Sequence, residues 1–264
     1  LGWNSTIGKV NYYLKGIYAF NRNKVIEKSE AAKPYPYMYE AGLPIKQFIG
    51  YQYDGFFSSY DEIASSPQQF GLTNLKPGDI KYKDINGDGI VDENDQAPIG
   101  YSTVPEMTYS LQLGASYKGF DVSVMFQGAA RSSVYLYQDL GWDNMTGNYY
   151  EEHINRWTPE TAATATYPRF LQGSKESHQN YYLSDFWLKD GKYLRLKNVM
   201  ISYTFDKKML RKTPFSSLKI FASGFNLITW DKLKKVDPEV APSSNTGYFY
   251  PQQRQYNMGI NVSF

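Results

Sequence analysis

The sequence has 264 residues, with no cysteine and only two histidines, His153 and His178. The absence of cysteine excludes disulfides, zinc thiolate sites and thiol nucleophiles. Neither histidine has metal-ligand spacing or a catalytic partner nearby in the sequence, so both are interpreted as loop residues. The chain also lacks any run of about 20 apolar residues, which excludes a membrane-spanning helix. Any insertion into a membrane must therefore be by strands.

The sequence also lacks an excess of either charge, since it contains 28 basic and 26 acidic residues. This balance gives no electrostatic argument for nucleic-acid binding. Glu151 and Glu152 are adjacent, so their carboxylates point apart and do not form a glycosidase pair. The sequence therefore predicts a protein that is not an enzyme. It begins at Leu1 without Met or a signal region, so we interpret it as a fragment or a processed piece.

Aromatic residues are abundant, at 17% of the chain with 25 Tyr. The last strand alternates strictly between two kinds of side chain. Its apolar set is Tyr256, Met258, Ile260, Val262 and Phe264, and polar or small residues lie between them. Period-two alternation that ends in a terminal aromatic residue is typical of a transmembrane β-barrel strand, with one face to lipid and the other to the lumen.

Seven segments carry strand signals. They are Val10–Phe20, Ile45–Phe57, Met107–Tyr117, Phe120–Gln127, Tyr193–Phe205, Leu218–Trp230 and the terminal strand. Lys118-Gly119 predicts a tight hairpin turn, and a parity switch near Lys197-Asn198 predicts a bulge. Short helices are expected at 60–70 and 206–212.

Connection lengths alternate between short and long, as in bacterial outer-membrane barrels. If the terminal strand runs toward the periplasm, the loops 58–104, 131–192 and 231–254 are extracellular. The link 27–44 is then a rather long periplasmic turn, which fits less well. Seven strands that begin and end in the same direction cannot close an even-numbered barrel, so we expect more chain before Leu1.

Residues 84–95 match a calcium loop. The predicted ligands are the side chains of Asp84, Asn86, Asp88, Asp92 and Asp95 and the backbone carbonyl of Ile90. Oxygen ligands at positions 1, 3, 5, 7, 9 and 12 wrap one hard cation, and Gly89 at position 6 permits the sharp turn. Asp95 is shorter than the usual Glu, as in dockerin-type loops. The alternative is a polar surface turn without an ion.

The long loops also carry aromatic residues. Trp142, Tyr149, Tyr150 and Trp157 are candidate substrate-binding residues, because aromatic rings stack on sugars and line peptide grooves. The alternative for each of them is packing within the loop itself.

Several of these segments resemble the carboxyl-terminal region of SusC/RagA-type TonB-dependent transporters of Bacteroidetes. The resemblance is carried, in order, by residues 76–89, 99–100, 116–121, 126–128, 188–199, 224–227, 237–239 and 250–254. It covers nearly the whole chain. It implies an all-β fold, an antiparallel transmembrane β-barrel segment with long extracellular loops that forms the last strands of a 22-stranded barrel, spanning 1–264.

The resemblance also implies a function. Such proteins import oligosaccharides, peptides or other nutrients through the outer membrane, with a SusD-type lipoprotein as a lid and energy from TonB. Outer-membrane lipid, the rest of the barrel, the plug and a glycan or peptide substrate are then the expected partners. The plug and the TonB contact would lie outside this chain. Phe264 would be the carboxyl-terminal aromatic signal for barrel assembly.

Two other interpretations remain. A secreted carbohydrate-binding β-sandwich with a structural calcium would share the alternation, the aromatics and the metal loop, because an apolar strand face can meet a second sheet instead of lipid. A dockerin-bearing scaffold component is the weaker alternative, since only one calcium loop is present.

Overall fold

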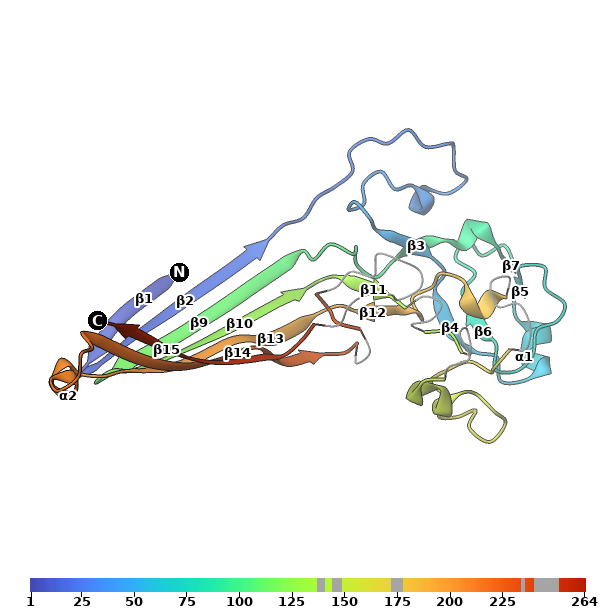
Figure 1. Cartoon of the computed structure of the whole chain (residues 1–264). Coiled ribbons are helices and arrows are strands. Elements are labelled where there is room, and N and C mark those ends of the chain that lie inside the picture. Colours follow the sequence, from blue (N-terminus) through green and yellow to red (C-terminus); the bar gives the residue numbers. More distant parts are fainter. Residues whose placement is uncertain (137–140, 144–148, 172–177, 234–235, 240–251) are drawn as a thin grey trace.

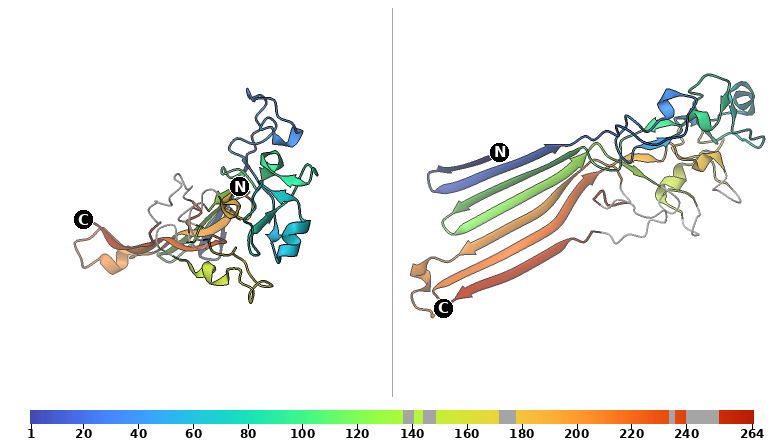
Figure 2. Two further views of the ribbon diagram at one scale, coloured as in Figure 1. Left: turned by 90° about the vertical axis from the view of Figure 1, so that its right-hand side faces the viewer. Right: turned by 90° about the horizontal axis from the view of Figure 1, so that it is seen from above.

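The computed structural model describes residues 1–136, 141–143, 149–171, 178–233, 236–239 and 252–264. Its main element is one antiparallel sheet of seven strands in the order β1-β2-β9-β10-β13-β14-β15 (Figures 1 and 2). The strands are β1 (Gly2–Ile7), β2 (Val10–Phe20), β9 (Met107–Tyr117), β10 (Phe120–Ala130), β13 (Tyr193–Thr204), β14 (Ser217–Asp231) and β15 (Gln255–Ser263). Most of them are long enough to cross a bilayer, which takes about 9–11 residues.

The two ends of this sheet differ. At one end, the turn end, the strands are joined by Gly8-Lys9, by Lys118-Gly119 and by residues 205–216, which include α2 (Lys207–Leu210). Lys118 and Gly119 have φ of 46° and 88°, as the predicted two-residue hairpin requires. At the other end, the loop end, two excursions of the chain gather beyond the strands (Figure 1). They are the first excursion, residues 21–106, and the second excursion, residues 131–192.

The sheet has one apolar and one polar face. On the apolar face, called the outer face, Tyr203 of β13 lies beside Phe120 of β10 and Ile220 of β14 in the strand register. On β15, Met258 is 90% exposed and Ile260 is 66% exposed. Within the described residues, the buried core clusters contain no residue of this face. The apolar face is therefore not covered by a second layer of the described chain.

The predicted bulge is confirmed. The pairing of β13 with β10 and with β14 shifts register at Lys197, which lies opposite no residue of either strand. Asn226 on β14 adopts a positive φ of 52°. The extra residue restores the facing of the strand, because the side chain of Arg195 then points to the same side as that of Asn198. The polar face thus continues to the loop end.

One predicted strand is wrong. Residues Ile45–Phe57 do not enter the sheet; they form β3 (Phe48–Gly50) and β4 (Tyr53–Phe56) at the loop end. Strand β2 instead pairs directly with β9. The predicted extracellular loop 58–104 is therefore the longer first excursion, 21–106. Val10–Phe20 also runs in the direction opposite to the predicted one. The strand count stays at seven because β1 was not predicted. The rather long periplasmic turn at 27–44 disappears with this correction.

The loop end is built from short elements. In the first excursion they are η1 (Pro36–Met38), β3, β4, α1 (Tyr60–Ser65), β5 (Gln68–Gln69), β6 (Ile80–Tyr82), β7 (Ile90–Val91), η2 (Glu93–Asp95) and β8 (Ala97–Ile99); in the second they are β11 (Ser133–Tyr135), η4 (Glu151–Asn155), η5 (Gln179–Tyr181) and β12 (Leu188–Asp190). Both predicted short helices are present, as α1 and α2, but shorter than predicted: the first ends at Ser65, and Gln68–Gln69 within its predicted span form β5. None of the described helices is long and apolar enough to cross a membrane.

The core of the loop end is aromatic and joins the two excursions. Its buried members are Tyr51, Ile80, Tyr82, Val91, Trp142, Tyr167, Tyr181 and Trp187. The backbone N–H of Tyr51 donates to the carbonyl of Leu183 at 2.9 Å, so the excursions also share backbone hydrogen bonds. The loop end therefore has its own packed interior rather than a set of separate loops.

The chain after β14 is held against β13 by buried charges. Arg195 is 1% exposed, and its Nη2 lies 2.6 Å from Asp237 Oδ2 while its Nη1 lies 3.1 Å from Glu239 Oε2. Lys197 Nζ reaches the same Glu239 oxygen at 2.8 Å. Two basic residues of the strand thus neutralise the two acidic residues of the Asp237-Pro238-Glu239 segment.

We expect Arg195→Ala to lower the free energy of unfolding by about 3–5 kcal/mol, because it leaves two mostly buried carboxylates with only one cation. Denaturant unfolding of the purified protein measures this loss. The matched control is Arg22→Ala, since Arg22 also pairs with a carboxylate, Glu106, but its side chain is 60% exposed. This control should lose less than about 1 kcal/mol, and equal losses in the two variants would contradict the assignment.

Candidate functional sites at the loop end and on the polar face

The 84–95 loop forms the turn expected from its sequence. Asp84 accepts hydrogen bonds from the backbone N–H of Gly87 at 2.6 Å and of Gly89 at 2.8 Å. Gly89 has a φ of 87°, which suits glycine at the sharp turn. Asp88 accepts from the N–H of Ile90 at 2.9 Å. The first half of the loop is thus wound around its own carboxylates.

Asp95 closes the second half of this loop. Its side chain is buried, and it accepts from the N–H of Ile85 at 2.7 Å and from that of Asp92 at 2.8 Å. Asp92 in turn accepts from the N–H of Asn94 at 2.7 Å, so that it caps η2. The last predicted ligand therefore lies beside the first residues of the loop, as a closed cation loop requires.

The donor set suits a hard cation by its chemistry. No lysine or arginine of the described chain makes an ion pair with Asp84, Asp88, Asp92 or Asp95. Oxygen-only donors with this many uncompensated carboxylates match the preference of Ca²⁺. The carboxylates do not converge, however: among the described residues, no group of three or more His, Cys, Asp or Glu side chains is gathered to hold a metal. They face backbone N–H groups instead.

A tyrosine connects this loop to the start of the first excursion. The hydroxyl of Tyr37 donates to the carbonyl of Asn94 at 2.6 Å. Burial raises the pKa of Tyr37, and the negative charge of Asp95 raises it further. The phenol is therefore a firm donor at neutral pH, and it ties the exposed segment around η1 to the 84–95 loop.

The four aromatic candidates for substrate contact differ in exposure. Trp142 is 2% exposed and packs on Tyr181 with ring centroids 4.7 Å apart, so it belongs to the core of the loop end. Trp157 is half-buried over Gly78. Tyr149 is 56% exposed, while Tyr150 is half-buried. Tyr149 thus offers the most surface to a ligand, and Trp142 offers almost none in this conformation.

A buried charge cluster that the sequence did not predict joins the two excursions. Arg169 Nε lies 2.7 Å from Asp79 Oδ1, and Asn180 donates to the same oxygen at 2.9 Å. His178 lies near this cluster, 3.9 Å from Asp79 Oδ2, and burial lowers its pKa. The cluster positions the second excursion against the first. Its partners are separated by some 90 residues, and no local sequence signal announces them.

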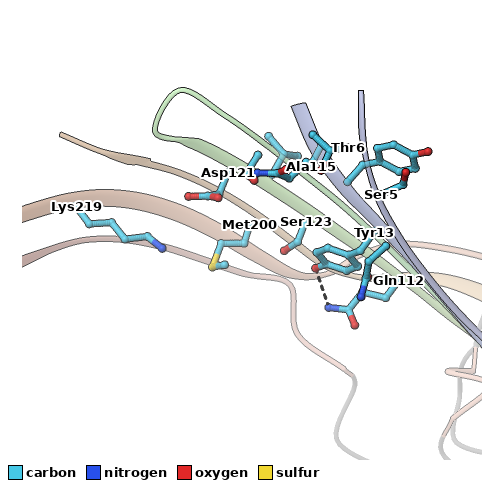
Figure 3. A pocket seen from close by; sticks show the side chains of 14 residues that line it. Ser5, Thr6, Tyr13, Gln112, Ala115, Asp121, Ser123, Met200 and Lys219 are labelled. Carbon is cyan, nitrogen blue, oxygen red and sulfur yellow. Dashed lines mark hydrogen bonds between the residues drawn. The ribbon is translucent and has the colours of Figure 1, made fainter. Parts of the chain in front are cut away.

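The polar face of the sheet carries a concavity of about 680 Å³ near the turn end. Figure 3 shows Tyr13 and Gln112 joined by a hydrogen bond, which is 3.3 Å long. Tyr13 covers Gly114 so closely that a Cβ there would clash with the ring. Asp121 and Lys219 lie further along the same concavity (Figure 3). Strand β1, which forms this edge of the sheet, was not predicted. The Gly8-Lys9 turn between Thr6 and Asn11 is the sequence signal that could have revealed it.

The terminal residue Phe264 is 86% exposed at the turn end. Its ring meets Phe215 edge to face, with centroids 5.4 Å apart. The end of β15 is also held by a backbone hydrogen bond of 2.8 Å from Ser216 to Ser263. The aromatic end of the chain is thus positioned by the link between α2 and β14.

Comparison with known sequences gives consistent matches. The chain is 29% identical over 237 residues to TonB-dependent receptor P26 of Formosa agariphila, which covers 84% of the chain and 23% of that protein. It is 27% identical to TonB-dependent receptor P3 of the same organism, and 23% identical over 227 residues to TonB-dependent receptor SusC of Bacteroides thetaiotaomicron, covering 20% of the latter. No protein-family model matches the chain. The chain thus spans about a quarter of the length of the curated relatives that it matches.

Solved structures give the same fold. All of the chain superposes on 28% of a chain in the RagAB peptide importer in the 'open-open' state, with a TM-score of 0.73 and 19% identity. A structure of the RagAB peptide transporter gives a TM-score of 0.72 and 20% identity. The chain is therefore a relative of the SusC/RagA-type TonB-dependent receptors, and its seven-stranded antiparallel sheet is part of a β-barrel of their type.

Proposed function

We propose that the chain is part of an outer-membrane, TonB-dependent importer of nutrients, and that the importer moves oligosaccharides or peptides rather than transforming them. The observation that carries the proposal is the uncovered apolar face of the sheet. A face on which Phe120 is 55% and Ile201 is 50% exposed, although both lie on inner strands of the sheet, is too apolar for water. Acyl chains cover such a face in an outer-membrane barrel, while the polar face lines the lumen.

The β-sandwich alternative is not favoured. A sandwich buries the apolar face of one sheet against a second sheet about 10 Å away. In the described part of the chain, the remaining sheets are two-stranded, and they gather with the excursions at the loop end (Figure 1). The sequence matches to TonB-dependent receptors also support the barrel.

Two adjacent positions on β15 test the membrane assignment. We expect Met258→Arg in the full-length receptor to destabilise the inserted barrel by up to about 2–4 kcal/mol, because it places a charge in hydrocarbon. Asn257→Arg is the matched control, since this residue faces the polar side of the same strand, and it should be tolerated. The readout is the heat-modifiable fraction of receptor in isolated outer membranes. Equal tolerance of both arginines would contradict the proposal.

The partners follow from the same assignment. We propose that a SusD-type lipoprotein closes over the loop end, where the two excursions form a packed platform, and that the plug and the TonB contact belong to the rest of the receptor. RagAB is described as a peptide importer, whereas aromatic residues such as Tyr149 suit a sugar ring equally well. The substrate is therefore proposed as an oligosaccharide or a peptide. Phe264 is proposed as the assembly signal of the barrel.

An uptake experiment tests the import function. Cells that lack the full-length receptor should lose uptake of one class within a panel of labelled oligosaccharides and peptides, and the wild-type gene should restore it. We expect Tyr149→Ala to weaken the apparent uptake affinity about three- to tenfold through lost aromatic contact. Tyr60→Ala is the control, because Tyr60 is similarly exposed, at 63%, but lies on α1. Unchanged uptake of the whole panel in the deletion strain would contradict import.

We also propose that the 84–95 loop binds one Ca²⁺ as a structural ion. The side chains of Asp84, Asn86, Asp88, Asp92 and Asp95 and the carbonyl of Ile90 would hold it. The ion would neutralise carboxylates that have no basic partner within the described residues, and would reduce the entropy lost when the platform is ordered against a lid. Because Tyr37 bonds to Asn94, the effect would extend to the segment around η1.

Calcium dependence is measurable by limited proteolysis of the full-length receptor. We expect added Ca²⁺ to slow cleavage in the first excursion and chelation to reverse this, because the ion cross-links the loop. Asp84→Ala should abolish the protection. Asp61→Ala is the control, since it removes an exposed acidic residue of α1 in the same excursion, and it should preserve the effect. Protection that is independent of Ca²⁺ would contradict the proposal.

A further inference from the structure

The turn end carries a group of basic side chains that the proposed import function leaves unused. Lys207, Lys208, Arg211 and Lys212 are exposed on and just after α2. Lys9 and Lys118 lie on the neighbouring turns. None of these six residues makes an ion pair with a carboxylate of the described chain. At this end, Asp206 instead uses its side chain to cap α2, accepting from the N–H of Lys208 at 3.0 Å.

The α2 segment lies against the outer face rather than under the lumen. The hydroxyl of Tyr203 contacts the sulfur of Met209 at 3.8 Å. Tyr203 in turn packs on Phe120, with ring centroids 4.5 Å apart, and both belong to the outer face. Figure 1 shows α2 projecting at the turn end of the sheet. The basic side chains are therefore adjacent to the apolar surface.

A shallow groove of about 560 Å³ lies on the outer face beside α2. Its outward-facing lining is Phe120, Ile201, Tyr203, Ile220, Ala222, Met258 and Ile260. These side chains come from β10, β13, β14 and β15, so the groove crosses the strands. Tyr203 belongs both to its lining and to the contact with α2, which makes the groove and the basic group continuous.

We propose that this surface binds an anionic phospholipid, with one acyl chain in the groove and the headgroup phosphate against the basic residues of α2. The proposal rests on the membrane location proposed above. An apolar groove that meets several cations without carboxylate partners matches both parts of such a lipid. Long basic side chains extend toward phosphates while their hydrocarbon stems stay on apolar surface, and each one strengthens binding to an anionic membrane surface about fivefold.

The test is native mass spectrometry of the purified full-length receptor after exchange into micelles doped with phosphatidylglycerol or phosphatidylcholine. We expect the wild-type receptor to retain phosphatidylglycerol at least about tenfold better than phosphatidylcholine, because two contacts of about fivefold each already exceed this ratio. The variant with Lys207→Gln, Lys208→Gln, Arg211→Gln and Lys212→Gln should lose this preference. The matched control carries Lys24→Gln, Lys46→Gln, Lys76→Gln and Lys232→Gln, four exposed lysines at the loop end, and should keep it.

A second pair of variants tests the groove separately from the charges. Ala222→Trp fills the groove with an apolar ring and should reduce retention of both lipids severalfold. Leu111→Trp places the same ring elsewhere on the outer face, on β9, and should leave retention unchanged. All variants are expected to insert and to show normal heat-modifiable mobility, because each substitution lies on an exposed surface.

Three results would overturn the proposal. They are an unchanged lipid preference in the α2 variant, an equal loss in the loop-end control, and displacement of the lipid by inorganic phosphate alone, which would point to an anion site without an acyl chain. Failure of the receptor to insert into membranes at all would instead contradict the proposed function. The two kinds of failure are therefore distinguishable.

Discussion

The backbone hydrogen-bond ladder of the seven-stranded sheet is the constraint on which the rest of the structure depends. Each of the five inner strands satisfies its polar backbone groups through two neighbours, so its side chains need only follow the alternation of two faces. The bulge at Lys197 matters for this reason, because it restores the facing of Arg195 without breaking the ladder. Everything at the loop end is attached to strand ends that this ladder holds in a fixed order.

The loop end is an independent layer of organisation. Its aromatic core and the Asp79–Arg169 ion pair join two excursions that are far apart in the sequence. Such a buried ion pair has a large desolvation cost that excellent geometry must offset, so it is weak evidence for stability, although it does join the two excursions. A packed platform loses little entropy on binding, which is consistent with the lid and substrate contacts proposed for this end.

Some charged groups of the molecule are paired and others are not. At the loop end, Arg195 and Lys197 are matched by Asp237 and Glu239, whereas the carboxylates of residues 84–95 and the cations around α2 have no such partners in the described chain. Unmatched charge next to water, as on the exposed Asp88 and the basic residues of α2, costs little, but it attracts counter-charges. The corresponding proposals are a bound cation in the 84–95 loop and a lipid phosphate at the basic residues of α2.

Features that depend on neighbours along the chain were predictable from the amino-acid sequence. Alternation set the faces of β9, β10 and β15, Lys118-Gly119 set the hairpin, and the spacing of residues 84–95 set a loop wound around its carboxylates. Long-range packing was not predictable in this way. It takes Ile45–Phe57 out of the sheet and buries Trp142, because Tyr51, Trp142 and Trp187 belong to one buried cluster that spans more than 130 residues of sequence. Period-two patterns report the local environment of a strand, but they carry no information about which distant segment will supply that environment.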